Sequence, residues 1–420
     1  MMKTLVTLTL LGLLAGCSPE VAEGGPAASN GFNVQRLQRI DDVIDAEIEA
    51  GLIPGAVALV ARDGDIVYHK SFGFADIDSG KPMTNDAIFR IASMTKAVTS
   101  AGVMMLYERG FFSLNDPVSD YLPAFRAPVV AVSFDDDGVV METRPASREI
   151  RIVDLLSHSS GIAYAFIDQS LQATYKAAGV IDGLTASDVK LAEGMQRLAE
   201  QPLLFDPGTR FNYGLSTDVL GYLIEVVSGR PLDRFFAEEI FAPLGMTDTY
   251  FYLPPDKAGR LVTLYSYVDG LRVTQGTEGD INFDNPRYPV EGAASYFSGG
   301  AGLSSTAHDY FRLVQMYLNE GELDGKRLLS RKSVALMQSP RIDWDDDGNA
   351  DFGLGFQVLG DIGKAGEIGT PGTYSWGGAF NTAFWIDPEE HLVAVFMSQV
   401  RPYTGDLRTR FRTAVYQALE

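Results

Sequence analysis

The sequence predicts an α/β protein of the α+β type, with an antiparallel sheet flanked by helices and a second, mostly helical lobe. Strand-turn-strand patterns occur near both ends of the chain, and the long middle carries helical patterns broken by Pro and Gly. Strands from both ends can pair in one sheet, with the terminal helices on one face. We expect a sheet lobe over about 33–112 and 296–420, and a helical lobe over about 113–295.

The sheet lobe begins with a helix and a hairpin. Apolar residues recur at helical spacing over residues 34–48, and Gly51 ends that pattern. Two apolar runs, 56–60 and 66–68, then flank the dipeptide Asp63-Gly64. This dipeptide is typical of the tight turn between paired antiparallel strands, so we expect a hairpin here.

The rest of this lobe is one buried helix and the C-terminal part of the chain. Residues 95–109 are apolar and rich in Ala and Met, which predicts a mostly buried helix. The apolar runs 383–386 and 392–396 flank a turn with Pro and Glu, so they predict a second hairpin. Residues 407–419 predict a closing helix.

The first residues have the pattern of an export signal. An apolar run over residues 4–14, too short to span a bilayer, follows the positive Lys3 and ends in Leu-Ala-Gly-Cys17. This end resembles the lipobox of bacterial lipoproteins. The resemblance implies a signal peptide over 1–16 and a lipid anchor on Cys17. The composition that follows, rich in Pro, Gly, Ala and Ser, predicts a flexible tether over 17–32. It also implies attachment to a bacterial membrane, facing the periplasm or the cell surface, and the outer membrane in a Gram-negative host. An ordinary secretory signal is the alternative.

Composition and the remaining motifs exclude several functional classes. The formal net charge of -21 repels nucleic acid, so we expect no nucleic-acid partner. The histidines are scattered without the spacing of metal ligands. The acidic stretch 343–348 resembles the start of a calcium loop, but Leu354 occupies the position of the bidentate Glu. We expect a solvated loop there, and neither a metal nor a cofactor.

Ser93 and Lys96 form a candidate nucleophile pair. If Ser93 opens the helix predicted over 95–109, Lys96 lies one turn further along and both side chains share a face. The free N–H groups of a helix N-terminus would stabilise an oxyanion, and an apolar setting disfavours a charged lysine. The pattern alone is weak, because residues 187–190 repeat it. We expect that second copy on the solvated face of a polar helix.

Four segments that occur in a fixed order along the chain strengthen the prediction that Ser93 and Lys96, rather than residues 187–190, form the nucleophile pair. They resemble class C β-lactamases and, more closely, family VIII carboxylesterases, and they are residues 89–100, 155–161, 207–221 and 374–378. The resemblance runs from about residue 35 to the C-terminus. It implies a fold like that of serine β-lactamases and penicillin-binding proteins.

The same resemblance implies roles for individual residues. Ser93 would attack a carbonyl and become acylated, while Lys96 and Tyr213 share the proton transfer. Either Tyr213 is the base beside a protonated Lys96, or a neutral Lys96 is the base and Tyr213 relays the proton. The backbone N–H groups of Ser93 and Ala379 would form the oxyanion hole. His158 is expected to tie down a turn.

Two positions depart from the lactamase pattern and bear on the substrate. Leu215 stands where the lactamases have an asparagine, and Trp376 stands where they have a lysine for the substrate carboxylate. Both changes remove polar recognition, so we expect a small-molecule carboxylic ester as substrate rather than a β-lactam. The expected substrate contacts are Trp376, Gly377, Gly378 and Leu215. The alternatives are a β-lactamase or D-Ala-D-Ala peptidase, and a non-catalytic binding lipoprotein.

Overall fold

The computed structural model describes residues 30–274, 285–345 and 351–420. The predicted signal peptide, Cys17 and almost all of the tether lie outside these residues, as does the end of the acidic stretch 343–348. Within the described residues, seven strands form one antiparallel sheet in the order β12-β13-β14-β15-β1-β2-β3. These strands are β1 (Gly55–Arg62), β2 (Asp65–Asp76), β3 (Lys81–Pro82), β12 (Gln357–Val358), β13 (Tyr374–Gly378), β14 (Thr382–Asp387) and β15 (Leu392–Met397).

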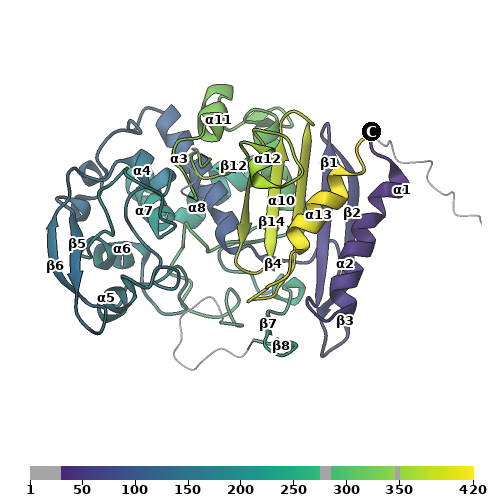
Figure 1. Cartoon of the computed structure of the whole chain (residues 1–420), viewed down its shortest axis with the longest axis horizontal. Helices are drawn as coiled ribbons and strands as arrows, with labels where there is room; N and C mark the ends of the chain where they lie inside the picture. Colours follow the sequence, from purple (N-terminus) through teal and green to yellow (C-terminus); the bar gives the residue numbers. More distant parts are fainter. Residues whose placement is uncertain (1–29, 275–284, 346–350) are drawn as a thin grey trace, which may run out of the picture.

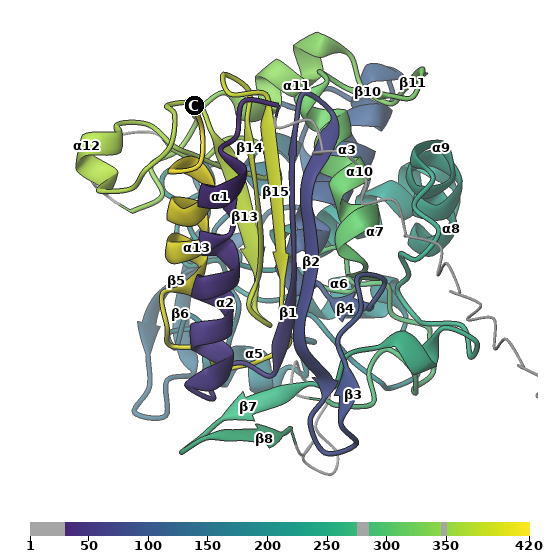
Figure 2. The same ribbon diagram turned by 90° about the vertical axis from the view of Figure 1, so that its right-hand side faces the viewer.

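The two ends of the chain meet in this sheet, as predicted. Strand β1 pairs with β2 on one side and with β15 on the other, so the two predicted hairpins, β1-β2 and β14-β15, lie next to each other. Helices α1 (Val34–Leu37), α2 (Arg39–Glu49) and α13 (Leu407–Tyr416) cover one face (Figure 2). Helices α3 (Thr95–Glu108) and α10 (Ala307–Leu318) cover the other face.

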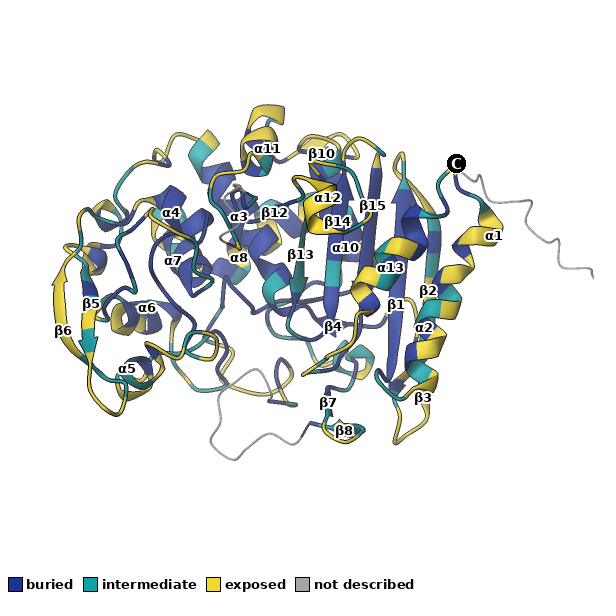
Figure 3. Cartoon of the chain, viewed as in Figure 1, coloured by how far each residue is buried: buried dark blue, intermediate teal, exposed yellow. Residues whose placement is uncertain are grey.

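Strand β1 shows why both faces need a cover. Its side chains alternate between two hydrophobic clusters: Val57 and Leu59 join the cluster that contains α3 and α10, while Ala58 and Val60 join the cluster that contains α2 and α13. Successive side chains of a strand point to opposite faces, so a strand that is apolar throughout must be buried on both. Figure 3 shows β1 and β15 buried along their lengths.

A mostly helical region lies beside the sheet (Figure 1). Its elements are α4 (Ile152–Leu156), α5 (Gln172–Ala177), α6 (Leu191–Ala199), α7 (Ser216–Ser228), α8 (Leu232–Phe236), α9 (Ala242–Leu244) and the hairpin β5-β6 (Val129–Phe134 and Val140–Pro145). The shorter elements elsewhere are β4 (Phe89–Arg90), β7 (Tyr265–Tyr267), β8 (Leu271–Val273), β9 (Ser304–Ser305), β10 (Glu322–Leu323), β11 (Lys326–Arg327), α11 (Arg331–Gln338) and α12 (Ile362–Ala365).

Two segments of the middle differ from the sequence prediction. The hairpin β7-β8 falls in the range predicted for the helical lobe but packs against the sheet, where Tyr265 is buried and its N–H donates to the Gln399 carbonyl. Residues 187–190, the second Ser-x-x-Lys, are irregular rather than helical. The Ser187 N–H donates to the Thr185 hydroxyl at 3.0 Å, a local bond that competes with helix formation. As expected, Asp188 and Lys190 are exposed.

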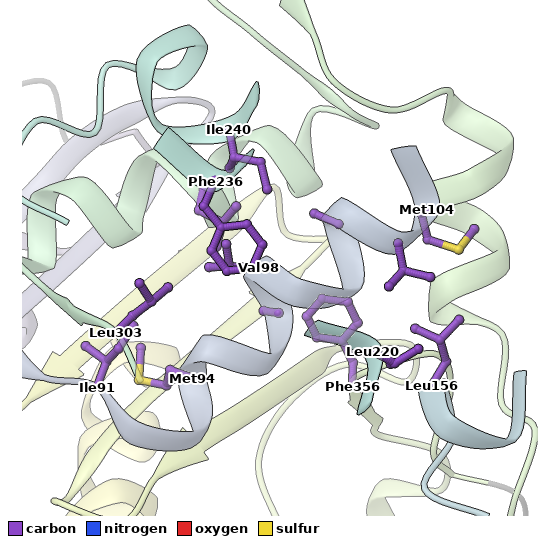
Figure 4. Packing of buried hydrophobic residues seen from close by; sticks show 14 of the residues in the cluster. Ile91, Met94, Val98, Met104, Leu156, Leu220, Phe236, Ile240, Leu303 and Phe356 are labelled. Carbon is purple, nitrogen blue, oxygen red and sulfur yellow. The ribbon is translucent and has the colours of Figure 1, made fainter. Parts of the chain in front are cut away.

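Helix α3 is the centre of the molecule. It is buried on all sides from Thr95 to Leu106, which is the pattern of a helix enclosed by other elements. Figure 4 shows Val98 and Met104 of α3 among Leu156, Leu220 and Phe236 of the surrounding helices. The N-terminal end of α3 is therefore held rigidly between the sheet and the helical region. None of the helices in the described ranges has the length and apolar character that a membrane span needs.

Candidate active site

Ser93 lies on a strained turn at the start of α3. A 3₁₀ turn over Ala92–Met94 precedes the helix, and Ala92 has a φ of 42°, in the left-handed region that a residue with a Cβ rarely adopts. The turn is fixed from outside, because the Ile91 N–H donates to the Leu303 carbonyl at 3.0 Å. Such strain persists only where the surroundings enforce it and is concentrated at functional sites. Ser93 itself is half-buried, whereas its neighbours are buried.

Lys96 lies one helical turn after Ser93, with only 2% of its surface exposed. Its Nζ is 3.3 Å from Ser93 Oγ, 3.1 Å from the Tyr164 hydroxyl and 2.8 Å from the Gly300 carbonyl oxygen. An ammonium group has three protons to donate, so these three acceptors satisfy it fully. The same geometry would let a neutral amine accept the Ser93 proton. The predicted proximity of Ser93 and Lys96 is therefore present.

The ring of Tyr213 lies next to the Lys96 amine. The Nζ of Lys96 is 4.6 Å from the centre of the Tyr213 ring. The Trp376 indole N–H donates to the Tyr213 hydroxyl at 3.3 Å. Three rings enclose the phenol, with centroids 4.8 Å away for His158, 5.4 Å for Tyr164 and 5.3 Å for Trp376. Trp376 was predicted to contact the substrate, and its indole N–H also contacts the predicted catalytic tyrosine.

His158 has a structural environment. It is buried, and its Nδ1 accepts the Gly214 N–H at 3.4 Å, directly after Tyr213. Burial, and then the charge of Lys96, hold the pKa of the imidazole well below its usual value, so the ring is neutral. The His158 carbonyl also accepts the Asn212 N–H, on the other side of Tyr213. His158 therefore fixes the backbone around Tyr213, as expected of a residue that ties down a turn.

Two residues of the site, Tyr164 and Asp218, were not predicted from the sequence. Tyr164 contacts Lys96, and burial raises the pKa of its phenol well above the usual value. Asp218 accepts the Ser298 hydroxyl at 2.5 Å and the Gly300 N–H at 3.4 Å, and burial raises the pKa of its carboxyl to about 6. Asp218 thus anchors the loop whose Gly300 carbonyl faces Lys96. Each residue had a signal: Tyr164 closely follows the second matched segment, and Asp218 lies inside the third.

One cavity of about 680 Å³ joins most of the predicted residues. Those that line it are Ser93, Tyr213, Trp376, Gly377, Gly378 and Ala379. Phe166, Ile167 and Trp344 add apolar lining. Leu215 is not among the lining residues; it is fully buried in the core next to α7, so its predicted substrate contact gains no support.

The last of the four matched segments, residues 374–378, forms strand β13, which packs against the turn that carries Ser93. A Cβ added to Gly378 would lie 2.3 Å from the Ile91 carbonyl oxygen, so only glycine allows the strand to approach the Ser93 turn this closely. Ala379 follows directly and shares the cavity lining. In the described ranges, no group of three or more His, Cys, Asp and Glu side chains is arranged to hold a metal ion.

Comparison with known proteins identifies the family of this chain. Residues 40–418 match the family model of Beta-lactamase. The chain is 36% identical to protein Rv1367c of Mycobacterium tuberculosis over 84% of this chain and 88% of that protein. It is 32% identical to esterase EstB of Burkholderia gladioli over 90% of this chain and 94% of that esterase. The solved structure of EstCE1, a hydrolase with promiscuous acyltransferase activity, superposes with a TM-score of 0.78 at 30% identity and covers 91% of this chain and 99% of its own.

Proposed function

Because the chain belongs to the β-lactamase family and is a serine hydrolase, we propose that it cleaves carboxylic esters through an acyl-enzyme on Ser93. The observation that carries the proposal is the 3.3 Å contact between Lys96 Nζ and Ser93 Oγ at the edge of a cavity. A serine hydroxyl needs an adjacent proton acceptor to become a nucleophile, and Lys96 with its neighbour Tyr213 supplies one.

The first half of the reaction forms the acyl-enzyme. Ser93 Oγ attacks the ester carbonyl carbon, and its proton passes to Tyr213 or Lys96. The carbonyl oxygen becomes an oxyanion, which the N–H groups of Ser93 and Ala379 would stabilise. When the tetrahedral intermediate collapses, the bond to the alkoxy oxygen breaks, and that oxygen takes the proton and leaves as an alcohol.

The second half releases the acid. A water molecule attacks the acyl carbon of the ester on Ser93, and the same two groups remove the water's proton. Collapse of the second tetrahedral intermediate breaks the bond to Ser93 Oγ, which takes the proton back. The Trp376 N–H donates to the Tyr213 oxygen, and the Lys96 amine, which would be positive if protonated, lies 4.6 Å from the centre of the Tyr213 ring. That oxygen must carry negative charge if Tyr213 is the acceptor.

The aromatic part of the cavity lining favours an apolar acyl group. Trp376 and Trp344 lie edge to face with ring centres 5.2 Å apart, and both line the cavity with Phe166. Phe380 and Asn381, which follow Ala379 in the sequence, are both buried and are not among the residues that line the cavity. Aromatic walls of this kind gain free energy by covering apolar surface of the substrate.

Hydrolysis of short-chain aryl esters tests the proposal. We expect turnover by the wild type, loss of turnover in Ser93→Ala with an unchanged melting transition, and an added acyl mass on Ser93 in intact-protein mass spectrometry. Absence of the acyl adduct together with full activity of Ser93→Ala would refute the proposal.

The same assay separates esters from lactams. We expect a higher kcat/KM for a short acyl ester than for a cephalosporin, because Trp376 stands where the lactamases have a lysine. A strong preference for the cephalosporin would replace the esterase proposal with a β-lactamase.

We also propose that the protein is exported and anchored by lipid on Cys17, from the sequence pattern alone. Incorporation of radioactive palmitate into the wild type, and its loss in Cys17→Ser, is the expected result. Equal labelling of the two proteins, or none in the wild type, would contradict the anchor.

A further inference from the structure

The arginines of helix α13 lie near its N-terminus, the end at which the helix dipole disfavours positive charge. Arg408, Arg410 and Arg412 all lie in its first two turns, where the helix dipole disfavours cations. Arg410 is compensated by Glu47 at 2.6 Å, and Arg412 by Glu367 at 2.7 Å. Among the described residues, Arg408 forms no ion pair with a carboxylate. A cation that breaks a local rule without a counter-ion suggests a functional constraint.

The partners of Arg408 are the two ends of one turn. Its Nη2 donates to the Gly378 carbonyl at 2.8 Å, and its Nε donates to Asn381 Oδ1 at 3.2 Å. Gly378 and Thr382 are paired at the end of β13 and β14, so residues 379–381 form the connecting turn. Asn381 has a φ of 65°, a conformation that asparagine tolerates in such turns. Figure 2 shows α13 alongside these two strands.

The bond to Gly378 fixes the direction of the next N–H. The Gly378 carbonyl and the Ala379 N–H belong to one peptide unit, which is trans, so they point in opposite directions. When Arg408 holds the carbonyl, the N–H must point away from the guanidinium. The positive charge also polarises the peptide, which makes its N–H a stronger donor.

The end of β13, Gly377 and Gly378, is closely packed on both sides. A Cβ on Gly377 would lie 2.7 Å from Arg408 Nη1, and a Cβ on Gly378 would lie 2.3 Å from the Ile91 carbonyl oxygen. The two glycines thus bring the strand end against the guanidinium and against the turn that carries Ser93. The Gly378–Ala379 peptide is held between them.

We propose that Arg408 is a positioning residue that aims the Ala379 N–H at the oxyanion. The inference rests on the proposed function, because it assigns a purpose to Arg408 only if Ser93 attacks a carbonyl. Arg408 also lines the cavity, but the role proposed for it is exerted through the peptide that it holds.

Steady-state kinetics of Arg408→Met, Arg408→Lys and the control Arg410→Gln test this role. The control removes a positive charge from the same helix, away from the cavity. For Arg408→Met we expect kcat on a short aryl ester to fall about 10- to 100-fold, less than the full loss of one oxyanion donor, with KM little changed. Arg408→Lys keeps the charge but cannot reach both acceptors, so it should recover only part of the rate. Added guanidinium ion should partly restore Arg408→Met.

A thiono analogue of the ester separates a positioning role from a purely structural one. Sulfur is a weak hydrogen-bond acceptor, so an intact oxyanion hole favours the oxygen ester strongly. We expect this preference to shrink in Arg408→Met and to stay unchanged in Arg410→Gln. Melting transitions verify that each variant is folded.

The outcomes distinguish this inference from the function on which it rests. If wild-type Ser93 is never acylated, the proposed function fails, and the role of Arg408 fails with it. If the wild type is active and folded Arg408→Met keeps the wild-type kcat, or loses rate without any change in the oxygen-to-sulfur preference, only the role of Arg408 is overturned.

Discussion

The chain contains the pattern Ser-x-x-Lys twice, in two different settings. Ser93 and Lys96 lie at the start of a buried helix, with the lysine amine bonded to the Tyr164 hydroxyl and the Gly300 carbonyl. In residues 187–190 the same residue types form an irregular surface segment with an exposed lysine. The serine and the lysine have the same spacing in both copies, so the chemistry must come from what surrounds them.

The difference lies in desolvation and in partners. Water around an exposed lysine keeps it an ordinary ammonium on a flexible stem. At Lys96 the surrounding protein replaces water with three fixed acceptors and the face of Tyr213, so a proton can move only between defined atoms. The second copy lacks such an enclosure, and three experiments test whether the enclosure is what matters.

Removing the two lysines in turn should give the largest contrast. We expect Lys96→Met to lower kcat/KM on a short aryl ester by about 10²- to 10⁴-fold, the usual contribution of a proton-transfer group. Lys190→Met should leave it unchanged, because that side chain is in solvent. Ester hydrolysis by the two purified variants is the measurement. A comparable loss in both would mean that the buried setting confers nothing.

Trp376→Phe should have a smaller effect. Phenylalanine keeps an aromatic wall but cannot donate to the Tyr213 hydroxyl. One hydrogen bond of this kind contributes about 1 kcal/mol, so we expect kcat to fall by up to about tenfold with KM nearly constant. Initial rates over a range of substrate concentrations would show the split. A rise in KM alone would assign Trp376 to substrate binding instead.

The smallest effect concerns stability and its dependence on pH. Burial raises the pKa of Asp218 to about 6 in the native protein, from 3.8 when it is exposed. The unfolded chain therefore loses this proton first, and the stabilisation is complete below about pH 4 and lost as pH rises through about 6. We expect the melting temperature of the wild type, measured relative to that of Asp218→Asn, to decrease as the pH is raised from about 4 to about 6.

Asp188, in the exposed copy, provides the matched control for that measurement. Its side chain is in solvent, so Asp188→Asn should melt with the same pH dependence as the wild type. If Asp218→Asn also melts in parallel with the wild type at every pH, the buried carboxyl does not titrate in this range.

Local patterns predicted the parts of the molecule that local physics determines. The two hairpins and the buried helix behind Ser93 follow from apolar periodicity and turn residues, and all three are present. Local patterns alone do not assign roles to Tyr164, Asp218 and Arg408, because each meets its partner only through the tertiary fold. The expected helix over 187–190 was wrong, and the Ser187 N–H there donates to the Thr185 hydroxyl, a local bond that competes with helix formation.

The central place of β1 beside β15 has a consequence for biosynthesis. Ser398 donates to the Gly55 carbonyl across 343 positions of sequence, so the middle of the sheet cannot close until the last strand has been made. During translation β1 and β2 lack their permanent neighbour, and a nascent chain in that state exposes an apolar strand edge. Such long-range pairing slows folding, so maturation of this protein should depend on factors that shield unfinished chains.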